Sequence, residues 1–426
     1  MTILVFLGVL LATVALGTPI AFAMLVTAVA LMIHLDMFDA QIIAQNLING
    51  ADSFPLLAVP FFLLAGEVMN AGGLSRRIVN VAIAFVGHVR GGLGYVVIFA
   101  SVLLASLSGS AVADSAALAA LLVPMMARAG HDRARSCGLV AAGGIIAPVI
   151  PPSIGFVVFG VASGVSISRL FLAGIAPGVM MGLVLLLVWS WVSRKEDTQP
   201  LPRVGRRDRL HAMVEGSWAL MLPVIIIVGL KMGVFTPTEA AVVAAVYSLL
   251  VATLVYRELK PKDILPVFVR AGVTTSVVMF LVAAAMVSAW LVTIADLPTQ
   301  LIELMEPLMA HPKLLLLFIM LVIVAVGCMM DMTPAILILA PVLMPVVQEA
   351  GIDPVYFGVM FIINCSIGLI TPPVGTVLNV VCGVGRVSFL ALIKGIWPFL
   401  LAQLILLVSF VSFPELIMVP ARWLNG

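Results

Sequence analysis

Two apolar stretches of this chain are each too long for one membrane span and too short for two. They run from about residue 93 to 126 and from about 314 to 346, and polar residues interrupt each near its middle. A spanning helix needs about 20 apolar residues, and irregular backbone survives at membrane depth only where protein or water covers it. The pattern therefore predicts two re-entrant helical hairpins, which turn within the membrane and leave on the side they entered.

The composition places these hairpins in a polytopic membrane protein. Hydrophobic residues make up 63% and charged residues 10% of the 426 residues, whereas soluble domains carry about 25% charged residues. The remaining apolar segments leave room for roughly ten spans. The first, from Ile3 to Leu16, follows no basic leader and is interpreted as a span, not a signal peptide. We expect an all-α polytopic fold with about ten transmembrane helices plus two hairpins.

The two halves of the chain repeat the same pattern of Pro, Gly and Asp residues. Adding 221 to a residue number in the first half recovers the same residue type in the second, in one register: Pro124 and Pro345, Gly130 and Gly351, Asp132 and Asp353, Pro151-Pro152 and Pro372-Pro373, Pro177 and Pro398. We predict a first repeat over residues 1–192 with a hairpin at about 93–128, a linker over 193–216, and a second repeat over 217–426 with a hairpin at about 314–346.

The distribution of charge orients the repeats. The arginine-rich stretch from Ser193 to Glu215 is predicted to be cytoplasmic, because cytoplasmic loops carry an excess of Lys and Arg. Counting spans outward then puts most of the 22 Lys and Arg residues inside and leaves the outer connections acidic. Both termini lie outside, the first hairpin enters from the cytoplasm, and the second enters from the periplasm. The repeats are therefore inverted, as in many secondary transporters.

Four polar breaks fall at membrane depth, two in the hairpins and two in later spans that contain Pro-Pro. Broken helix ends offer carbonyls and hydroxyls that suit a small hard cation, and helix N-termini that suit an anionic group. Two such sites fit two coupling ions with an anion between them. The breaks are residues 106–115 (SLSGSAVADS), 143–155 (GGIIAPVIPPSIG), 327–335 (GCMMDMTPA) and 366–376 (SIGLITPPVGT).

Structural explanations compete for several of these residues. Serine and glycine in membrane helices also serve close packing, and a Pro-Pro pair can be a plain kink. Asp114 and Asp331 are harder to explain in this way, since no basic residue at matching depth offers a salt bridge. Glu67 and Glu239 are further acidic residues in or near spans.

Enzyme and metal functions are disfavoured. An intramembrane serine protease needs a histidine or lysine base at the depth of its serine, and all five histidines fall near segment ends. The chain has no HExxH and no Walker A sequence. Its four cysteines stand singly, so we expect neither a disulfide nor a transition metal. Hairpins with inverted repeats favour an alternating-access transporter over a channel.

Several motifs closely resemble the large membrane subunit of tripartite ATP-independent periplasmic (TRAP) transporters, the DctM-like family. They are residues 108–114 (SGSAVAD), 124–126 (PMM), 150–153 (IPPS), 331–341 (DMTPAILILAP), 351–354 (GIDP) and 367–375 (IGLITPPVG).

The resemblance implies an elevator-type protein of the ion transporter superfamily in the bacterial inner membrane. It would be a Na⁺-driven importer of an organic acid, such as a C4-dicarboxylate, sialic acid or a sugar acid. A soluble periplasmic binding protein would deliver the substrate, and a small four-helix membrane subunit, a separate chain, would brace the scaffold. No cofactor is implied besides Na⁺ as the coupling ion.

The resemblance also implies site residues, each at a matching position. A first Na⁺ site would comprise Ser106, Ser108, Ser110 and Asp114, with carbonyls near Gly144 and Pro148. A second would comprise Gly327, Asp331, Thr333, Gly368 and Thr371, with a carbonyl of Val374. The substrate would lie between the two tips, near Ser153, Thr376 and Asn379.

Two alternatives remain open. A stand-alone divalent-anion/Na⁺ symporter or an arsenite-type permease resembles the same hairpin and Pro-Pro architecture but needs no delivery protein. A membrane-embedded hydrolase belongs to a different class, and labelling by a serine-reactive probe would reveal it.

Overall fold

The computed structural model describes residues 2–196 and 198–425, and every regular element in this part of the chain is helical. The first half contains α1 Thr2–Ala15, α2 Ile20–His34, α3 Ala40–Ala51, η1 Phe54–Leu57, α4 Ala58–Ala71, α5 Leu74–Val86, α6 Gly92–Ser108, α7 Ala111–Arg128, α8 Arg133–Gly144, α9 Ile154–Ser163, α10 Ile167–Val192 and η2 Ser193–Lys195. The second half contains α11 Arg206–Lys231, α12 Pro237–Leu250, the π-helical turn η3 Val251–Val255, α13 Pro261–Ile294, α14 Leu297–Met309, α15 Pro312–Gly327, α16 Met332–Glu349, α17 Pro354–Gly368, α18 Thr376–Gly385, α19 Phe389–Ser412 and α20 Glu415–Asn425.

The helices are long and apolar enough for a membrane protein. Eight of those described could cross a membrane by length and composition, and seven shorter helices are also apolar. Two of the predicted spans are each split into a pair of short helices, α8 with α9 and α17 with α18. The helical membrane class is confirmed, whereas the count of ten spans stays a prediction.

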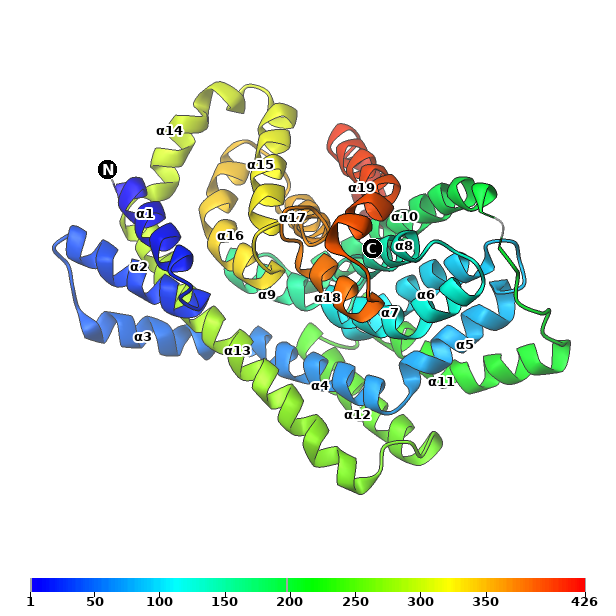
Figure 1. Ribbon diagram of the computed structural model, residues 1–426. Helices are drawn as coiled ribbons and strands as arrows, with labels where there is room; N and C mark the ends of the chain where they lie inside the picture. The colour runs from blue at the N-terminus through cyan, green and yellow to red at the C-terminus, as the bar shows by residue number, and fades with distance from the viewer. Residues whose placement is uncertain (1, 197, 426) are drawn as a thin grey trace.

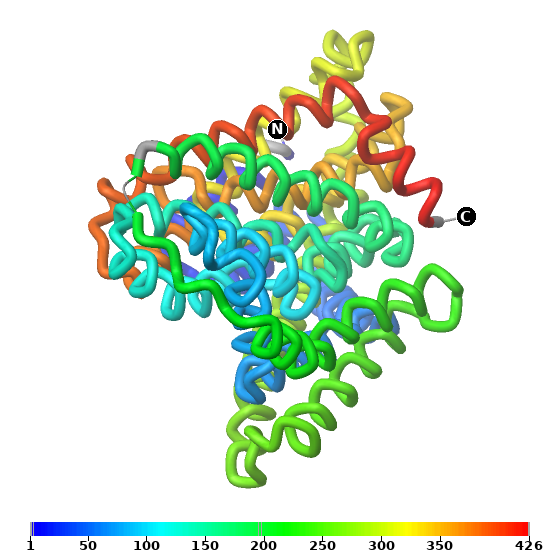
Figure 2. Tube along the Cα trace, turned by 90° about the vertical axis from the view of Figure 1, so that its right-hand side faces the viewer, coloured from blue at the N-terminus to red at the C-terminus, as the bar shows by residue number. Residues whose placement is uncertain are grey.

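The helices form two groups, and each group combines both halves of the chain (Figure 1). The frame, as we call α1–α5 with α11–α14, holds together because α13 packs against α2, α3 and α4, α12 against α4, and α11 against α5. The core bundle, α6–α10 with α15–α20, is joined by α8 against α19, α7 against α18, and α9 against α16. Figure 2 shows the N-terminal part of α13 and the helices beside it extending below the core bundle.

The two hairpins and the two broken segments are present where the polar breaks predicted them. The first hairpin is α6 and α7, joined only by Gly109 and Ser110. Gly109 has φ +62°, a left-handed conformation that suits glycine. The return helix begins at Ala111, inside the predicted break at 106–115, because the Ser110 side chain caps it by accepting a hydrogen bond from the Ala113 amide. The second hairpin is α15 and α16, joined by residues 328–331.

Positions related by the 221-residue offset take the same local role at several points. The side chains of Asp132 and Asp353 cap the N-termini of α8 and α17. Both Pro-Pro pairs contain a cis peptide bond and lie in the break of a split segment. The inverted relation of the two halves stays a prediction.

Three helices fall where the hydropathy pattern predicted only connections. They are α3, α5 and α14, each 12 or 13 residues long and amphipathic. Asp39 starts α3 by accepting a hydrogen bond from the Gln41 amide at 2.7 Å. Their apolar faces are too narrow to register as apolar segments. The predicted linker is also shortened, because α11 begins at Arg206.

The start of the linker is fastened to the loop between α7 and α8. The Glu196 carboxylate lies 2.6 Å from Nδ1 of the buried His131 and accepts a hydrogen bond from Arg135 at 2.8 Å. Burial alone would raise the pKa of Glu196, but these two hydrogen bonds outweigh it and hold the pKa below its usual range. The Gln199 amide also donates to the Ala129 carbonyl.

Candidate functional site

A cavity of about 230 Å³ lies between the two hairpin tips. Both tips, both broken segments and two frame helices contribute to it. Its lining is Leu63, Gly109, Ser110, Ala111, Val112, Pro148, Ile154, Gly155, Thr274, Val278, Asp331, Met332, Thr333 and Leu369. The fold therefore brings all four predicted breaks to one place.

The first hairpin tip is organised around a buried carboxylate. Asp114 is only 4% exposed, and its Oδ1 accepts a hydrogen bond from Ser108 Oγ at 2.6 Å. The Ser110 amide donates to Ser108 Oγ at 3.2 Å, so the turn folds back over this pair. The second oxygen, Asp114 Oδ2, is buried and has no hydrogen-bond partner. A buried carboxylate oxygen without a partner is costly, and a cation beside it would remove that cost.

Two further members of the predicted first cation site are Ser106 and Gly144. Ser106 is buried, and its hydroxyl donates to the Leu103 carbonyl, so the oxygen is free only as an acceptor. Gly144, the last residue of α8, lies against the Ser115 hydroxyl, and a side chain there would collide with it. The Ser115 hydroxyl is itself buried without a partner.

The first broken segment contacts the first tip directly. A Cβ added to Gly109 would lie 2.8 Å from the Pro152 carbonyl oxygen and 3.2 Å from the Ser153 Cα. Pro148 lines the cavity, and its carbonyl accepts a hydrogen bond from Ser153 Oγ. The same serine oxygen accepts from the Phe156 amide and caps α9. The predicted substrate residue Ser153 is thus fully buried behind the cavity wall.

The second hairpin tip is more open. Asp331 precedes α16 without capping it through its side chain, is exposed, and lines the cavity with Thr333. Behind it, Gly327 and Gly368 are packed backbone to backbone, because a Cβ added to Gly368 would lie 2.8 Å from the Gly327 Cα. The Gly375 amide donates to the Cys328 carbonyl at 3.0 Å. These contacts fasten the tip to the second broken segment.

The remaining predicted residues lie near the second break and outside the cavity lining. The Thr371 hydroxyl donates to the Ile367 carbonyl at 2.8 Å. The Val374 carbonyl accepts from the Asn379 amide at 3.1 Å, and Asn379 is exposed. The Thr376 hydroxyl is buried without a hydrogen-bond partner. Nothing in the contacts of Asn379 or Thr376 brings either side chain into the cavity.

Three helix N-termini converge on the cavity. The first residues of α7, α9 and α16, namely Ala111, Ile154 and Met332, all line it. The N-terminus of a helix presents unpaired backbone N–H groups and a partial positive charge. None of the described lining residues is basic. Attraction for an anion must therefore come from helix N-termini and from any cation bound at the tips.

The donor atoms around the tips suit an alkali cation better than a transition metal. The described residues contain no cluster of three His, Cys, Asp or Glu side chains that could hold a metal ion. What the tips offer instead is one carboxylate each, with hydroxyl and carbonyl oxygens. Such oxygen ligands are preferred by hard cations.

Some residues at the site were not identified from the sequence as site residues. Ser115, which follows Asp114 in the first break, has a buried hydroxyl that lies against Gly144 without a hydrogen-bond partner. Leu63, Thr274 and Val278 form the frame side of the cavity. No local sequence signal marks these three, because their role arises from packing between distant helices. Glu239, by contrast, caps α12 together with Thr236 and lies outside the site.

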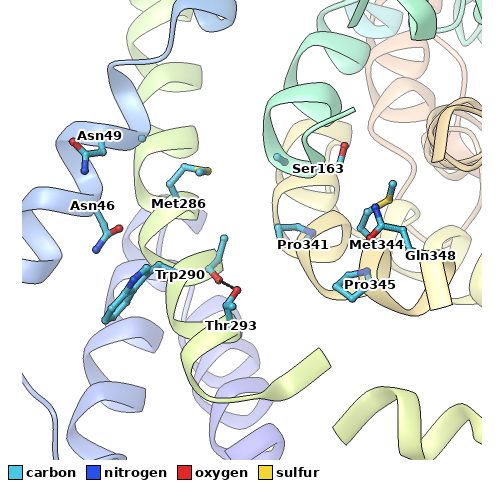
Figure 3. Close-up of a pocket in the computed structure, with 13 residues that line it drawn as sticks. Asn46, Asn49, Ser163, Met286, Trp290, Thr293, Pro341, Met344, Pro345 and Gln348 are labelled. Atoms are coloured by element: carbon cyan, nitrogen blue, oxygen red, sulfur yellow. Dashed lines mark hydrogen bonds between the residues drawn. The ribbon is translucent and has the colours of Figure 1, made fainter. Parts of the chain in front are cut away.

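A second, larger cavity of about 440 Å³ separates the frame from the core bundle near the ends of α9 and α16 (Figure 3). Met286 and Thr293 on α13 face Pro341, Met344 and Gln348 on α16 across it. Asn46, Asn49 and Ser163 add further neutral polar groups. This cavity leaves the two helix groups apart at that level.

The fold and the site define a polytopic membrane permease with paired hairpins. The family "Tripartite ATP-independent periplasmic transporter, DctM component" matches residues 7–416, and the chain therefore belongs to the DctM family of TRAP transporter large permeases. It is 58% identical over 425 residues, all of both chains, to the 2,3-diketo-L-gulonate TRAP transporter large permease protein YiaN of Escherichia coli. It is 39% identical to the sialic acid TRAP transporter large permease protein SiaM of Vibrio cholerae, covering 94% of this chain and 93% of that one.

The fold is also similar to a solved structure. The Alcanivorax borkumensis YdaH transporter superposes with a TM-score of 0.64 at 16% identity, covering 89% of this chain and 91% of that one. At this identity the likeness shows the fold alone. The relatives in sequence are permease subunits, which points to a transporter and not an enzyme.

Proposed function

We propose that this chain is the large subunit of a Na⁺-coupled importer of an organic acid, and that the acid binds in the cavity between the hairpin tips. The observation that carries the proposal is the convergence of three helix N-termini on a cavity whose described lining has no basic side chain. Helix N-termini bind carboxylates well. A site built in this way gains affinity for an anion when cations occupy its rim.

Two cation positions adjoin that cavity. The first lies beside Asp114, whose Oδ2 is buried without a hydrogen-bond partner and whose Oδ1 accepts a hydrogen bond from Ser108 Oγ. Ser110 and Ser115 belong to the same hairpin tip. The second lies beside Asp331, near Thr333 and the paired glycine backbones. Each cation would neutralise one carboxylate, so the acid binds tightly only when the cations are bound. This dependence is what couples the two fluxes.

The two helix groups support an elevator movement. Each hairpin and broken segment belongs to the core bundle, whereas the frame contributes only Leu63, Thr274 and Val278 to the cavity. The core bundle therefore holds nearly all of the site and can carry it past the frame as one body. The neutral cavity between the groups (Figure 3) leaves room for relative motion.

The substrate and partners follow from the family. The named relatives carry 2,3-diketo-L-gulonate and sialic acid, both hydroxylated carboxylic acids, and the first is the more similar to this chain. We assign a sugar acid as the substrate class. A periplasmic binding protein would deliver it, and a small membrane subunit would pack against the frame in the bacterial inner membrane. Ser153, Thr376 and Asn379 stay candidate substrate positions for another stage of transport.

Uptake in proteoliposomes tests the proposal. Vesicles with this chain and its small membrane partner would be offered labelled 2,3-diketo-L-gulonate, N-acetylneuraminate and succinate. Each acid would be tested with and without an inward Na⁺ gradient and the periplasmic protein. We expect uptake of a sugar acid only when both the inward Na⁺ gradient and the periplasmic protein are present. Uptake that needs Na⁺ alone would instead indicate a stand-alone symporter, and uptake without Na⁺ would refute the coupling.

A further inference from the structure

One ion pair between two candidate membrane-spanning helices has no place in the site described so far. Arg270 on α13 donates from Nε to Glu67 Oε2 on α4 at 3.0 Å, which joins two frame helices. Charged side chains within spans are costly and are usually functional. The pair is also open, since 54% of the Arg270 side chain and 35% of the Glu67 side chain are exposed. An open pair leaves the guanidinium accessible to another anion.

The pair lies one helical turn from the cavity on both helices. Residues four apart share one face of a helix. Leu63 and Thr274 line the cavity, Glu67 follows the first by four positions, and Arg270 precedes the second by four. The Thr274 hydroxyl donates to the Arg270 carbonyl at 3.1 Å. Both charged residues therefore continue the cavity wall beyond its frame side.

The neighbour of Glu67 on α4, Gly66, also lies near the first hairpin tip. A Cβ added to Gly66 would lie 3.8 Å from the Cα of Ser108, at the first hairpin tip. Arg270 thus lies one helical turn from a cavity whose described lining contains no basic side chain. A carboxylate leaving the cavity along this wall meets a guanidinium already engaged by another carboxylate.

We propose that Arg270 is a transient binding position for the substrate carboxylate on the frame, and that Glu67 is an internal competitor that releases it. The inference rests on the proposed function. With the acid absent, Glu67 occupies the guanidinium. When the acid passes, its carboxylate replaces Glu67. Glu67 then displaces it toward the N-terminal end of α13, which the outward count of spans puts on the cytoplasmic side together with Arg257, Lys260 and Lys262. No covalent step is involved.

The roles of the two residues predict opposite effects of neutralising each. Arg270→Gln removes the attraction, so the half-saturating concentration of 2,3-diketo-L-gulonate in Na⁺-driven uptake should rise about threefold or more. Glu67→Gln removes the competitor, so the half-saturating concentration should fall about threefold while the maximal rate also falls, because release is slowed. Arg270→Lys, which keeps the charge, should lie close to the native chain.

An ion pair that only holds α4 and α13 together predicts a different outcome. Both neutral variants break the same ion pair, so a purely structural pair predicts the same effect on uptake for both. Shifts of the half-saturating concentration in the same direction, or no shift, would overturn the inference. Glu258→Gln is the matched control, because Glu258 pairs with Arg76 and Arg77 on the frame at 2.8 and 2.7 Å but does not line the cavity. It should leave half-saturation unchanged. Absence of Na⁺-driven uptake in the native chain would instead refute the proposed function itself.

Discussion

Replacing Asp114 by Asn tests the first cation position with little change of shape. The side chain is 4% exposed, and the Asn oxygen can keep the hydrogen bond from Ser108 Oγ. What is lost is one charge beside the predicted Na⁺. Two unit charges about 4 Å apart interact by about 4 kcal/mol at an effective dielectric constant of about 20. Since about 1.4 kcal/mol corresponds to a factor of ten, Na⁺ affinity at this position should fall about a thousandfold.

The assay is thermal unfolding of the purified chain in detergent, in Na⁺ and in a choline buffer of equal ionic strength. At a Na⁺ concentration a hundred times the dissociation constant of the first position, native protein should gain about 2.7 kcal/mol from Na⁺ bound at that position alone. Asp114→Asn should lose most of that gain. It should also be more stable than the native chain in choline, because a buried unpaired charge has been removed.

Asp132→Asn is the matched control for this experiment. The same chemical change is made at the N-cap of α8, where Asp132 accepts from the Arg135 amide at 2.7 Å, and Asn caps helices as well as Asp does. The control should keep the native response to Na⁺. If Asp114→Asn also keeps it in full, the first cation position is misplaced.

Three further predictions concern other parts of the chain. Asp331→Asn should weaken the Na⁺ dependence of uptake, and a variant with the native Na⁺ response would show that the second position is wrong. Gly368→Ala should destabilise the fold by about 1–3 kcal/mol in thermal unfolding, because its Cβ meets the Gly327 backbone, whereas Gly383→Ala, with nothing within 4 Å, should be nearly neutral. The pKa of Glu196 is lower in the folded protein than in the unfolded chain. Its interactions therefore stabilise the fold at a pH above the pKa of the unfolded chain, and this stabilisation is lost as the pH falls through the pKa of the folded protein. Glu196→Gln should therefore cost about 1–3 kcal/mol at pH 7 and much less at about pH 3; an equal cost at both would contradict the pairing.

The sequence predicted the breaks well because each break changes the chemistry of the backbone. Gly109 and Ser110 end one helix and cap the next, and the Pro-Pro pairs remove donors that a continuous helix requires. Such signals are local and need no knowledge of the packing. The hairpins and split segments could therefore be placed to within a few residues.

Features that depend on packing between distant segments could not be found in this way. The Glu67–Arg270 pair joins residues 203 positions apart, and nothing near either one predicts the other. The direction of a hydroxyl is equally hidden: Ser153 caps α9 from behind the cavity wall, while Ser110 lines the cavity. The amphipathic helices α3, α5 and α14 were not predicted, because the hydropathy pattern detects long apolar segments and not an apolar face on one side of a helix.

We propose that an organic acid enters the cavity between the tips only with cations bound beside both. The Na⁺ dependence of organic-acid uptake by the reconstituted transporter, at fixed membrane potential, tests this. We expect uptake to rise cooperatively with Na⁺ concentration, and this cooperativity to be lost in both Asp114→Asn and Asp331→Asn. Full uptake in Na⁺-free medium, or a cooperative response unchanged in both variants, would contradict it.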